Sequence, residues 1–423
     1  MANRTVVRGL LAAACVAALA VAQAPWGDAG AGKGSEPAKQ GDPKWAPAVQ
    51  PKPLSAGVKR GLAWLVEHQL PSGGWGQGEE SAAMGGGGSM KDVPSVADTC
   101  LAALALVRSG STPAKGEHAQ HVLEAVSFVC GEIEKADQDS LYVTSTRGTR
   151  VQSKLGPYVD TFMASLLLSE VREQMPDSQG RKRAADALDK VLHKMQKHQR
   201  ADGTWGDQGW AATLSQAMAA KGLNRAAQGG YGVDEGVRAK AEEYARRQFD
   251  KSSGQFSGAG SAGVPLYSAG SNLGAVADSV NTNRQQEAAL RRQLATETAP
   301  AAREQAQKKL DRFEAAKKDL AEAQRAVVAR LDDKQFIAGF GSNGGEEFLS
   351  YMNIGESLVV QGGDAWKSWD KSITENLNRV QNNDGSWTGH HCVTGRTFCT
   401  AAALMVLLVD RAPVPVAARI RQR

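Results

Sequence analysis

The feature of this sequence that most constrains its fold is an internal repeat. Three segments, QLPSGGWG, QRADGTWG and QNNDGSWT, begin at Gln69, Gln199 and Gln381. In each copy a tryptophan follows the glutamine six residues later, and glycine lies between the two. A looser copy, QFDKSSGQF, begins at Gln248. Because the spacing recurs far apart along the chain, each copy marks one unit of a repeat architecture.

Each copy lies between two helical patterns of different character. The segments before the turns, such as RAADALDKVLHKMQKHQ, alternate charges with an apolar stripe, as in a helix with one face in water. The segments after the turns, such as YVDTFMASLLLS, are almost wholly apolar, which is typical of a helix buried on both sides. One unit is therefore expected to consist of an outer helix, a turn and an inner helix.

The turn itself has a physical interpretation. We expect Gly74, Gly203 and Gly385 to supply the positive φ that a tight turn after a helix requires. The tryptophan is expected to cover carbonyl groups at the helix end, and the glutamine to bond backbone groups that the helix leaves unpaired.

Counting the units gives six helix pairs. Outer helices are expected over 55–69, 115–136, 180–199, 233–249, 300–332 and 365–381, and inner helices over 94–109, 158–175, 209–222, 266–282, 346–361 and 395–410. Six pairs can close into a ring, so the predicted fold is all-α, an α6/α6 toroid over residues 53–412. Residues 283–333 are rich in Ala, Gln, Glu, Lys and Arg and predict a projecting helical hairpin of coiled-coil type, interrupted near Pro300.

The glutamine and tryptophan that flank these Gly-rich turns resemble the repeats of squalene cyclases and of protein prenyltransferase β subunits, over roughly residues 55–410. The resemblance implies a toroid whose central cavity binds an apolar or isoprenoid-like small molecule or lipid. The DxDD motif with which cyclases protonate their substrate is absent. Whether this chain is an enzyme, as a transferase or a cyclase-like protein, stays open.

The resemblance also implies a hypothesis about metal binding. Prenyltransferases hold zinc with an Asp-x-Cys pair at the start of an inner helix and a distant histidine. Asp98 and Cys100 have this spacing, and His390 or His391 could complete the site if a closed ring brings the first and last units together. The chain would then be a zinc-dependent prenyl-type transferase.

Two carboxylates suggest a different enzyme. Asp98 and Asp160 stand at equivalent positions at the start of two inner helices. They could simply cap free N–H groups at the helix ends. They could instead act as paired acid and base in a glycan-acting toroid enzyme. A non-catalytic repeat scaffold is the remaining alternative.

The loop before the last inner helix is the other candidate for chemistry, since it holds His390, His391, Cys392 and Arg396. The alternative is a polar loop with a disulfide between Cys392 and Cys399. Polar residues in an otherwise apolar inner helix, together with Arg396, predict the lining of a ligand cavity: Tyr351, Asn353 and Glu356.

The N-terminus predicts export. Arg4 and Arg8 precede a short apolar run that ends at Ala22, which is the pattern of a signal peptide over residues 1–22. The alternative is an uncleaved anchor, which would be the chain's only membrane contact. Residues 23–52 lack apolar periodicity and predict a disordered linker, and residues 413–423 form a basic tail. We expect a periplasmic or secreted protein.

Charge and cysteine content limit the partners. The net charge is only +5, and the basic residues form no nucleic-acid-binding motif, so nucleic acid is not an expected partner. Four cysteines follow the signal peptide: Cys100, Cys130, Cys392 and Cys399. They could form two disulfides in an oxidising compartment or remain free as small buried residues.

Overall fold

The computed structural model describes residues 44–206, 208–341 and 343–416. The predicted signal peptide and most of the predicted linker lie outside these ranges. The described chain is built of helices, with two short two-stranded ribbons, which confirms the all-α class. None of its described helices is both long enough and apolar enough to cross a membrane.

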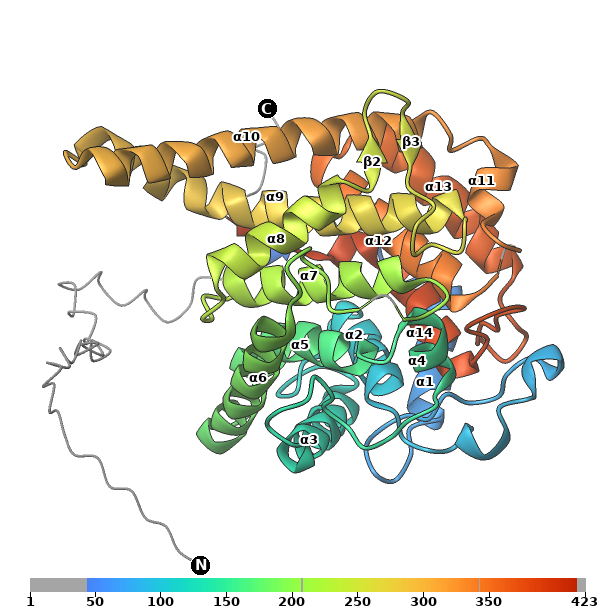
Figure 1. Ribbon diagram of the computed structural model, residues 1–423. Helices are drawn as coiled ribbons and strands as arrows, with labels where there is room; N and C mark the ends of the chain where they lie inside the picture. Colours follow the sequence, from blue (N-terminus) through green and yellow to red (C-terminus); the bar gives the residue numbers. More distant parts are fainter. Residues whose placement is uncertain (1–43, 207, 342, 417–423) are drawn as a thin grey trace, which may run out of the picture. The chain divides into compact units, whose positions relative to one another are not determined.

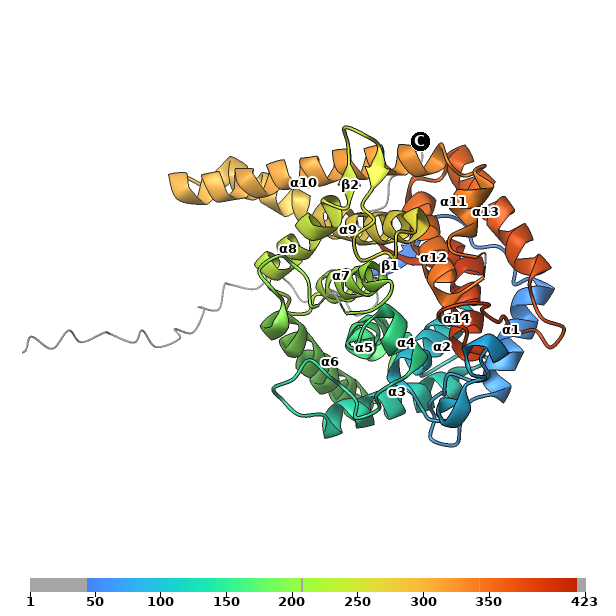
Figure 2. The ribbon, with the colours of Figure 1, turned by 45° about the vertical axis from the view of Figure 1, so that its right-hand side comes forward.

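Six largely buried helices form the inner layer. They are α2 (Val96–Arg108), α5 (Val159–Val171), α7 (Ala212–Gln228), α9 (Pro265–Thr296), α12 (Gly345–Gln361) and α14 (Arg396–Leu407). Each packs against the next in this order, and α14 packs against α2, so the contacts close a ring (Figure 2). Their apolar side chains form one continuous core. Each of the six predicted units therefore contains an inner helix.

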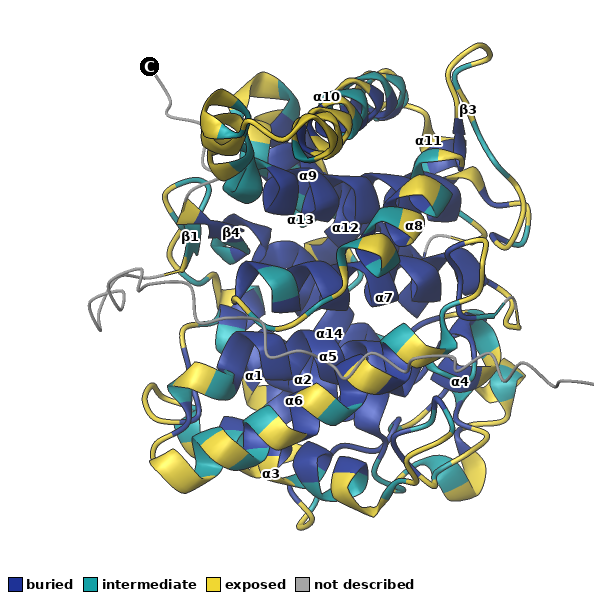
Figure 3. Cartoon of the chain, turned by 60° about the vertical axis from the view of Figure 1, so that its left-hand side comes forward, coloured by how far each residue is buried: buried dark blue, intermediate teal, exposed yellow. Residues whose placement is uncertain are grey.

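Six further helices form the outer layer. They are α1 (Ala56–Glu67), α3 (Ala119–Lys135), α6 (Ser178–His198), α8 (Glu235–Arg246), α10 (Pro300–Val328) and α13 (Gly363–Arg379). Buried and exposed residues alternate along them, whereas the inner helices are buried almost throughout (Figure 3). This difference is the one that the amphipathic and apolar patterns predict.

Short elements complete the chain. They are α4 (Arg150–Leu155), which precedes α5; α11 (Lys334–Ala338), which precedes α12; the 3-10 helices η1 (Ala82–Met84), η2 (Gly88–Met90), η3 (Arg172–Gln174) and η4 (Val409–Arg411); and the ribbon of β2 (Phe249–Asp250) with β3 (Gln255–Phe256).

The predicted hairpin is present. Helix α9 continues beyond its inner-layer part to Thr296, and α10 starts at Pro300, where proline is tolerated in the first turn. The two helices pack along each other and project from the ring (Figure 1). Three apolar side chains of α10 are buried in this part of the molecule: Leu310, Phe313 and Leu320.

The three tryptophans of the repeat occupy the same place. Each indole N–H donates to a carbonyl ten residues earlier, near the end of an outer helix: Trp75 to Leu65 at 2.8 Å, Trp205 to Met195 at 2.6 Å, and Trp387 to Leu377 at 2.9 Å. All three are nearly or fully buried. The predicted structural role of these tryptophans is therefore confirmed.

The glutamines join neighbouring units. The amide of Gln69 donates to a carbonyl of its own turn and to His121 at the next outer helix, at 3.0 Å. Gln199 does the same with Val237 of α8. Gln381 bonds Gly57 of α1 at 2.8 Å, so the last unit is tied to the first by the same contact.

The prediction that Gly74 takes a positive φ is wrong, because the residue concerned is Gly73, at 83°. Gly203 and Gly385, at 91° and 94°, are as predicted, and all three stand four residues after the glutamine. A Cβ on Gly203 would also collide with the carbonyl oxygen of Lys240 on α8. Glycine is thus required both by the turn and by the close approach of the next outer helix.

The linker and tail boundaries need correction. Strand β1 (Trp45–Pro47) lies inside the predicted linker 23–52, and β4 (Pro413–Pro415) lies inside the predicted tail 413–423. The two pair antiparallel, and the Trp45 indole also donates to Gln228 at the end of α7. Neither segment has a periodic pattern that predicts a strand. Each is ordered by pairing with a segment far away in sequence.

The disulfide alternative is not supported. All four described cysteines are free and buried. The Cys399 thiol donates instead to the carbonyl oxygen of Val393, at 3.3 Å. The pairing of Cys392 with Cys399 considered from the sequence is therefore wrong, and the thiols behave as small core residues.

Candidate active site

The starts of several inner helices meet at one end of the ring. Asp160, in the first turn of α5, accepts a hydrogen bond from the Ala97 N–H of α2 at 2.9 Å. The Gly345 N–H of α12 donates to Val393, which precedes α14. The Thr397 N–H of α14 donates to Gln77, which precedes α2. We call this the N-terminal end of the ring.

Glu347 and His391 form a pair at this end. The carboxylate of Glu347 is fully buried, and its Oε1 accepts from the Tyr267 hydroxyl at 2.6 Å and from the Phe340 N–H at 2.9 Å. Its Oε2 lies 3.4 Å from Nε2 of His391. Neither imidazole nitrogen makes a hydrogen bond to another described residue. Glu347 thus contacts a histidine whose two ring nitrogens are buried and have no hydrogen-bond partner in the described chain.

Glu346 is a second buried carboxyl beside this pair. Its Oε2 accepts from the Val393 N–H at 3.2 Å, while its Oε1 has no hydrogen-bond partner among the described residues. Burial raises the pKa of Glu346 to about 8, and the neighbouring charge of Glu347 adds to the shift. At neutral pH this group is protonated and can donate a proton.

The structure separates the roles of Asp98 and Asp160. Asp160 accepts from the Ala97 N–H and from the Gln152 side chain at 2.8 Å, so it caps α2 and is fully engaged. Both carboxyl oxygens of Asp98 are buried without a partner, and burial raises the pKa of Asp98 to about 7. The two do not form a symmetric acid and base pair.

The Cys399 thiol feels the charges of Asp98 and of the other two carboxyls. Burial raises the pKa of the Cys399 thiol well above its usual value, and the nearby charges of Glu346, Glu347 and Asp98 raise it further. The charges of these three carboxyls therefore act on one thiol of α14. Glu346 and Glu347 were missed from the sequence, although adjacent acids in the first turn of an apolar helix were a usable signal.

Two exposed aromatic rings lie beside His391. Trp210 is 42% exposed and Phe340 is 54% exposed, whereas most large apolar side chains are buried. Their rings meet edge to face at 5.9 Å, and Phe340 lies 5.2 Å from the His391 ring. Trp210 precedes α7 and Phe340 precedes α12, so the rings bring distant units together at the N-terminal end.

The predicted zinc site is not assembled. Within the part of the chain that the structure describes, no group of three or more His, Cys, Asp or Glu side chains is placed to hold a metal ion. Cys100 is fully buried, and burial raises the pKa of its thiol well above the usual value. His390 is exposed, and its backbone N–H donates to the Asn343 carbonyl. The set of Asp98, Cys100 and His390 or His391 is therefore wrong.

The predicted cavity lining is divided among three places. The hydroxyl of Tyr351 donates to Ile337 at 2.5 Å and its ring meets Trp369 of α13, so this side chain faces the outer layer. Arg396 contacts Ser386 at 2.6 Å in the turn of the last unit. Asn353 is buried without a hydrogen bond to its amide group in the described chain. These three do not line one common site.

Glu356 belongs to a buried ionic network that the sequence did not reveal. Lys221 pairs with Asp278 at 2.7 Å and with Glu356, and Glu170 binds Arg108 and Arg225. Five inner helices contribute to this cluster: α2, α5, α7, α9 and α12. The partners of each ion pair lie on different helices, so the sequence pattern does not show which charges meet.

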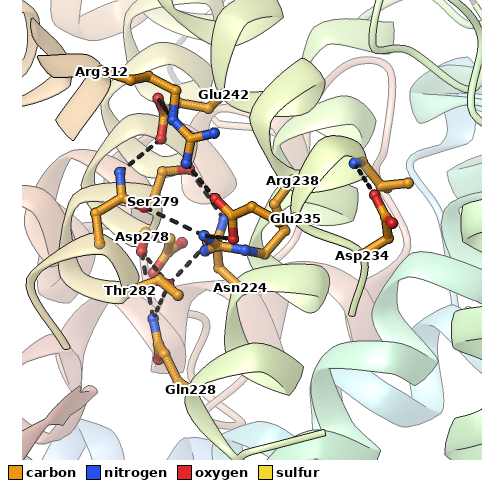
Figure 4. A network of polar contacts seen from close by, with 12 residues as sticks. Asn224, Gln228, Asp234, Glu235, Arg238, Glu242, Asp278, Ser279, Thr282 and Arg312 are labelled. Carbon is orange, nitrogen blue, oxygen red and sulfur yellow. Dashed lines mark hydrogen bonds and ion pairs between the residues drawn. The ribbon is translucent and has the colours of Figure 1, made fainter. Parts of the chain in front are cut away.

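Hydrogen bonds continue from this cluster toward the projecting hairpin. Figure 4 shows Thr282 and Gln228 bonded to Asp278, and Asn224 bonded to Arg238 of α8 at 2.8 Å. Arg312 of α10 forms an ion pair with Glu235. The network satisfies buried polar groups between units, which is a structural role.

The raised pKa of Glu346 predicts a pH effect on stability. Glu346 loses its proton near pH 4.5 in the unfolded chain but near pH 8 in the folded protein. The folded state then holds the extra proton, so stability from this group is full below about pH 4.5 and is lost as pH rises toward about 8. In urea unfolding, Glu346→Gln should lose less stability over this range than the wild type. Equal losses in the two proteins would refute this.

Comparisons with known proteins identify no family. No family model matches the chain, and no curated protein matches it. Among solved structures, a wild-type glycosidase chain and a chain of its point variant are similar to it, each at 13% identity and a TM-score of 0.31, covering 84% of this chain and 95% of the other. A likeness at this level carries no conclusion about fold or activity.

Proposed function

We propose that this protein is a glycan-acting hydrolase whose acid–base site lies at the N-terminal end of the ring. The observation that carries the proposal is the fully buried Glu346, with one unpartnered oxygen, near the Glu347–His391 pair, whose histidine ring contacts the exposed Phe340. Buried ionisable groups with shifted pKa values are typical of catalytic sites.

The groups match the needs of glycoside hydrolysis. Protonated Glu346 can give its proton to the glycosidic oxygen as the C–O bond breaks. His391, beside Glu347, can take a proton from the water whose oxygen joins the anomeric carbon. Sugar rings have apolar C–H faces that pack on aromatic rings, and Trp210 and Phe340 present such surfaces.

The other hypotheses receive less support. An apolar or isoprenoid-like ligand inside the ring stays a prediction, but the Lys221, Asp278 and Glu356 charges on the inner helices disfavour an apolar lining at that level. The predicted export suits an enzyme that meets glycans outside the cell. A scaffold without catalysis gives no reason for buried carboxyl oxygens without a hydrogen-bond partner, one in Glu346 and two in Asp98.

Release of reducing ends from a panel of polysaccharides tests the proposal. Wild-type protein should hydrolyse at least one, and Glu346→Gln and His391→Ala should each lower kcat by about 100-fold or more, the usual contribution of an acid or base. Glu375→Gln is the matched control, because Glu375 is exposed on α13. Full activity in Glu346→Gln, or inactivity of the wild type on every glycan, would overturn the proposal.

A further inference from the structure

A lysine beside the candidate site has no anionic partner. Lys154, on α4, is partly buried, and it makes no ion pair or side-chain hydrogen bond with any described residue. Within the described chain its side chain contacts the ring of Trp210, with Nζ 5.6 Å from the ring centroid. The ammonium group therefore lies beside the exposed aromatic surface of the site.

The neighbouring arginine on the same helix makes a clear contrast. Arg150, one turn before Lys154, donates two hydrogen bonds of 3.0 Å to the buried carboxylate of Glu80. The charge of Arg150 is therefore neutralised inside the protein. Lys154 has no such carboxylate, although many other lysines in the chain do, such as Lys221 with Asp278.

Near neutral pH, the positive charge of Lys154 is not neutralised by an ion pair with a carboxylate of the described chain. The positive charge of Lys154 slightly lowers the pKa of the Glu346 carboxyl. Glu346 is protonated at pH 7, since burial dominates its pKa. A partly desolvated cation that has no ion-pair partner attracts an anion from outside the protein.

We propose that the substrate is an acidic glycan, such as a uronate or a sulfated sugar, whose anionic group binds Lys154 while a sugar ring packs on Trp210. This inference rests on the proposed function and specifies its substrate class. Lys154 is here a specificity-determining residue and takes no part in proton transfer.

Binding of matched oligosaccharides tests this inference. The probes are a galacturonate hexasaccharide with its carboxyl-reduced neutral form, a glucuronate-containing hexasaccharide with its reduced form, and a sulfated oligosaccharide with its desulfated form. Calorimetry uses full-length Glu346→Gln protein, because glutamine keeps the neutral charge of the protonated acid and prevents cleavage. At low salt an acidic probe should bind about tenfold more tightly than its neutral partner, the size of one ion pair of about 1.4 kcal/mol.

Variants separate charge from packing. Adding Lys154→Met should abolish the preference for the acidic form, Lys154→Arg should retain it, and salt should weaken it. Lys59→Met, an exposed lysine on α1, is the matched control and should leave it unchanged. Trp210→Ala should weaken the binding of both the acidic and the neutral oligosaccharide.

The outcomes distinguish this inference from the proposed function. If a glycan is cleaved in a Glu346-dependent way but acidic and neutral forms bind equally, the substrate class is wrong and the hydrolase proposal stands. If Lys154→Met keeps the acidic preference, the role of Lys154 is wrong. If no sugar is bound or cleaved, the hydrolase proposal itself fails.

Discussion

Replacing Lys221 with methionine is expected to lower the free energy of unfolding by about 3–5 kcal/mol. Lys221 is only 2% exposed, and its ammonium group pairs with Asp278 and Glu356 inside the ring. Methionine fills a similar volume but leaves two buried carboxylates without the ammonium group that pairs with both. The measurement is urea unfolding followed by circular dichroism.

Two further variants show that the loss comes from unpaired charge. Lys59→Met changes an exposed lysine of α1 and should alter stability by less than about 0.5 kcal/mol. Combining Lys221→Met with Asp278→Leu and Glu356→Leu should recover much of the loss, because replacing a whole buried ion cluster by apolar residues is often neutral. A Lys221→Met protein as stable as the Lys59→Met control would contradict the role assigned to this cluster.

The sequence was sufficient to predict the layers of the fold. Helix periodicity depends only on nearby residues, so the amphipathic and apolar patterns located all six outer and inner helices to within a few residues at most ends, and Pro300 located the start of α10. The hydrogen bonds of Gln69, Trp75 and their counterparts followed from the same local repeat.

The site depended on contacts between distant segments, which periodicity does not report. His391 lies near Glu347 because α12 and the loop before α14 meet at the N-terminal end of the ring. Asp98 and Asp160 were correctly placed at helix starts, but only the structure shows that Asp160 is engaged and Asp98 is not. A shared helix position therefore does not imply a shared role.

The corrected elements have the same cause. Strands β1 and β4 are ordered by each other across almost the whole chain, and neither has a pattern of its own. The proposed ligands Cys100 and His390 belong to different surroundings, one in the apolar core and one at the surface. Composition and spacing show neither the distance between such segments nor how deeply each residue is buried.

Trp387→Ala is expected to cost about 3–5 kcal/mol of stability and to weaken the contact between the last and first units. The indole is fully buried, donates to Leu377 at 2.9 Å and packs on α1, where a Cβ at Gly61 would lie 2.8 Å from the ring. Removing it leaves a cavity at the contact that closes the ring, and leaves the Leu377 carbonyl without this donor.

Urea unfolding of Trp387→Ala beside Trp210→Ala separates this role from a general effect of losing a tryptophan. Trp210 is 42% exposed and donates no such bond, so its removal should cost less than about 1 kcal/mol. Hydrogen exchange should rise most in α1 and α14 of the Trp387→Ala protein, because these helices meet at the closing contact. Equal stability losses in the two variants, or exchange that rises evenly around the ring, would show that the turn tryptophan does not hold the last unit to the first.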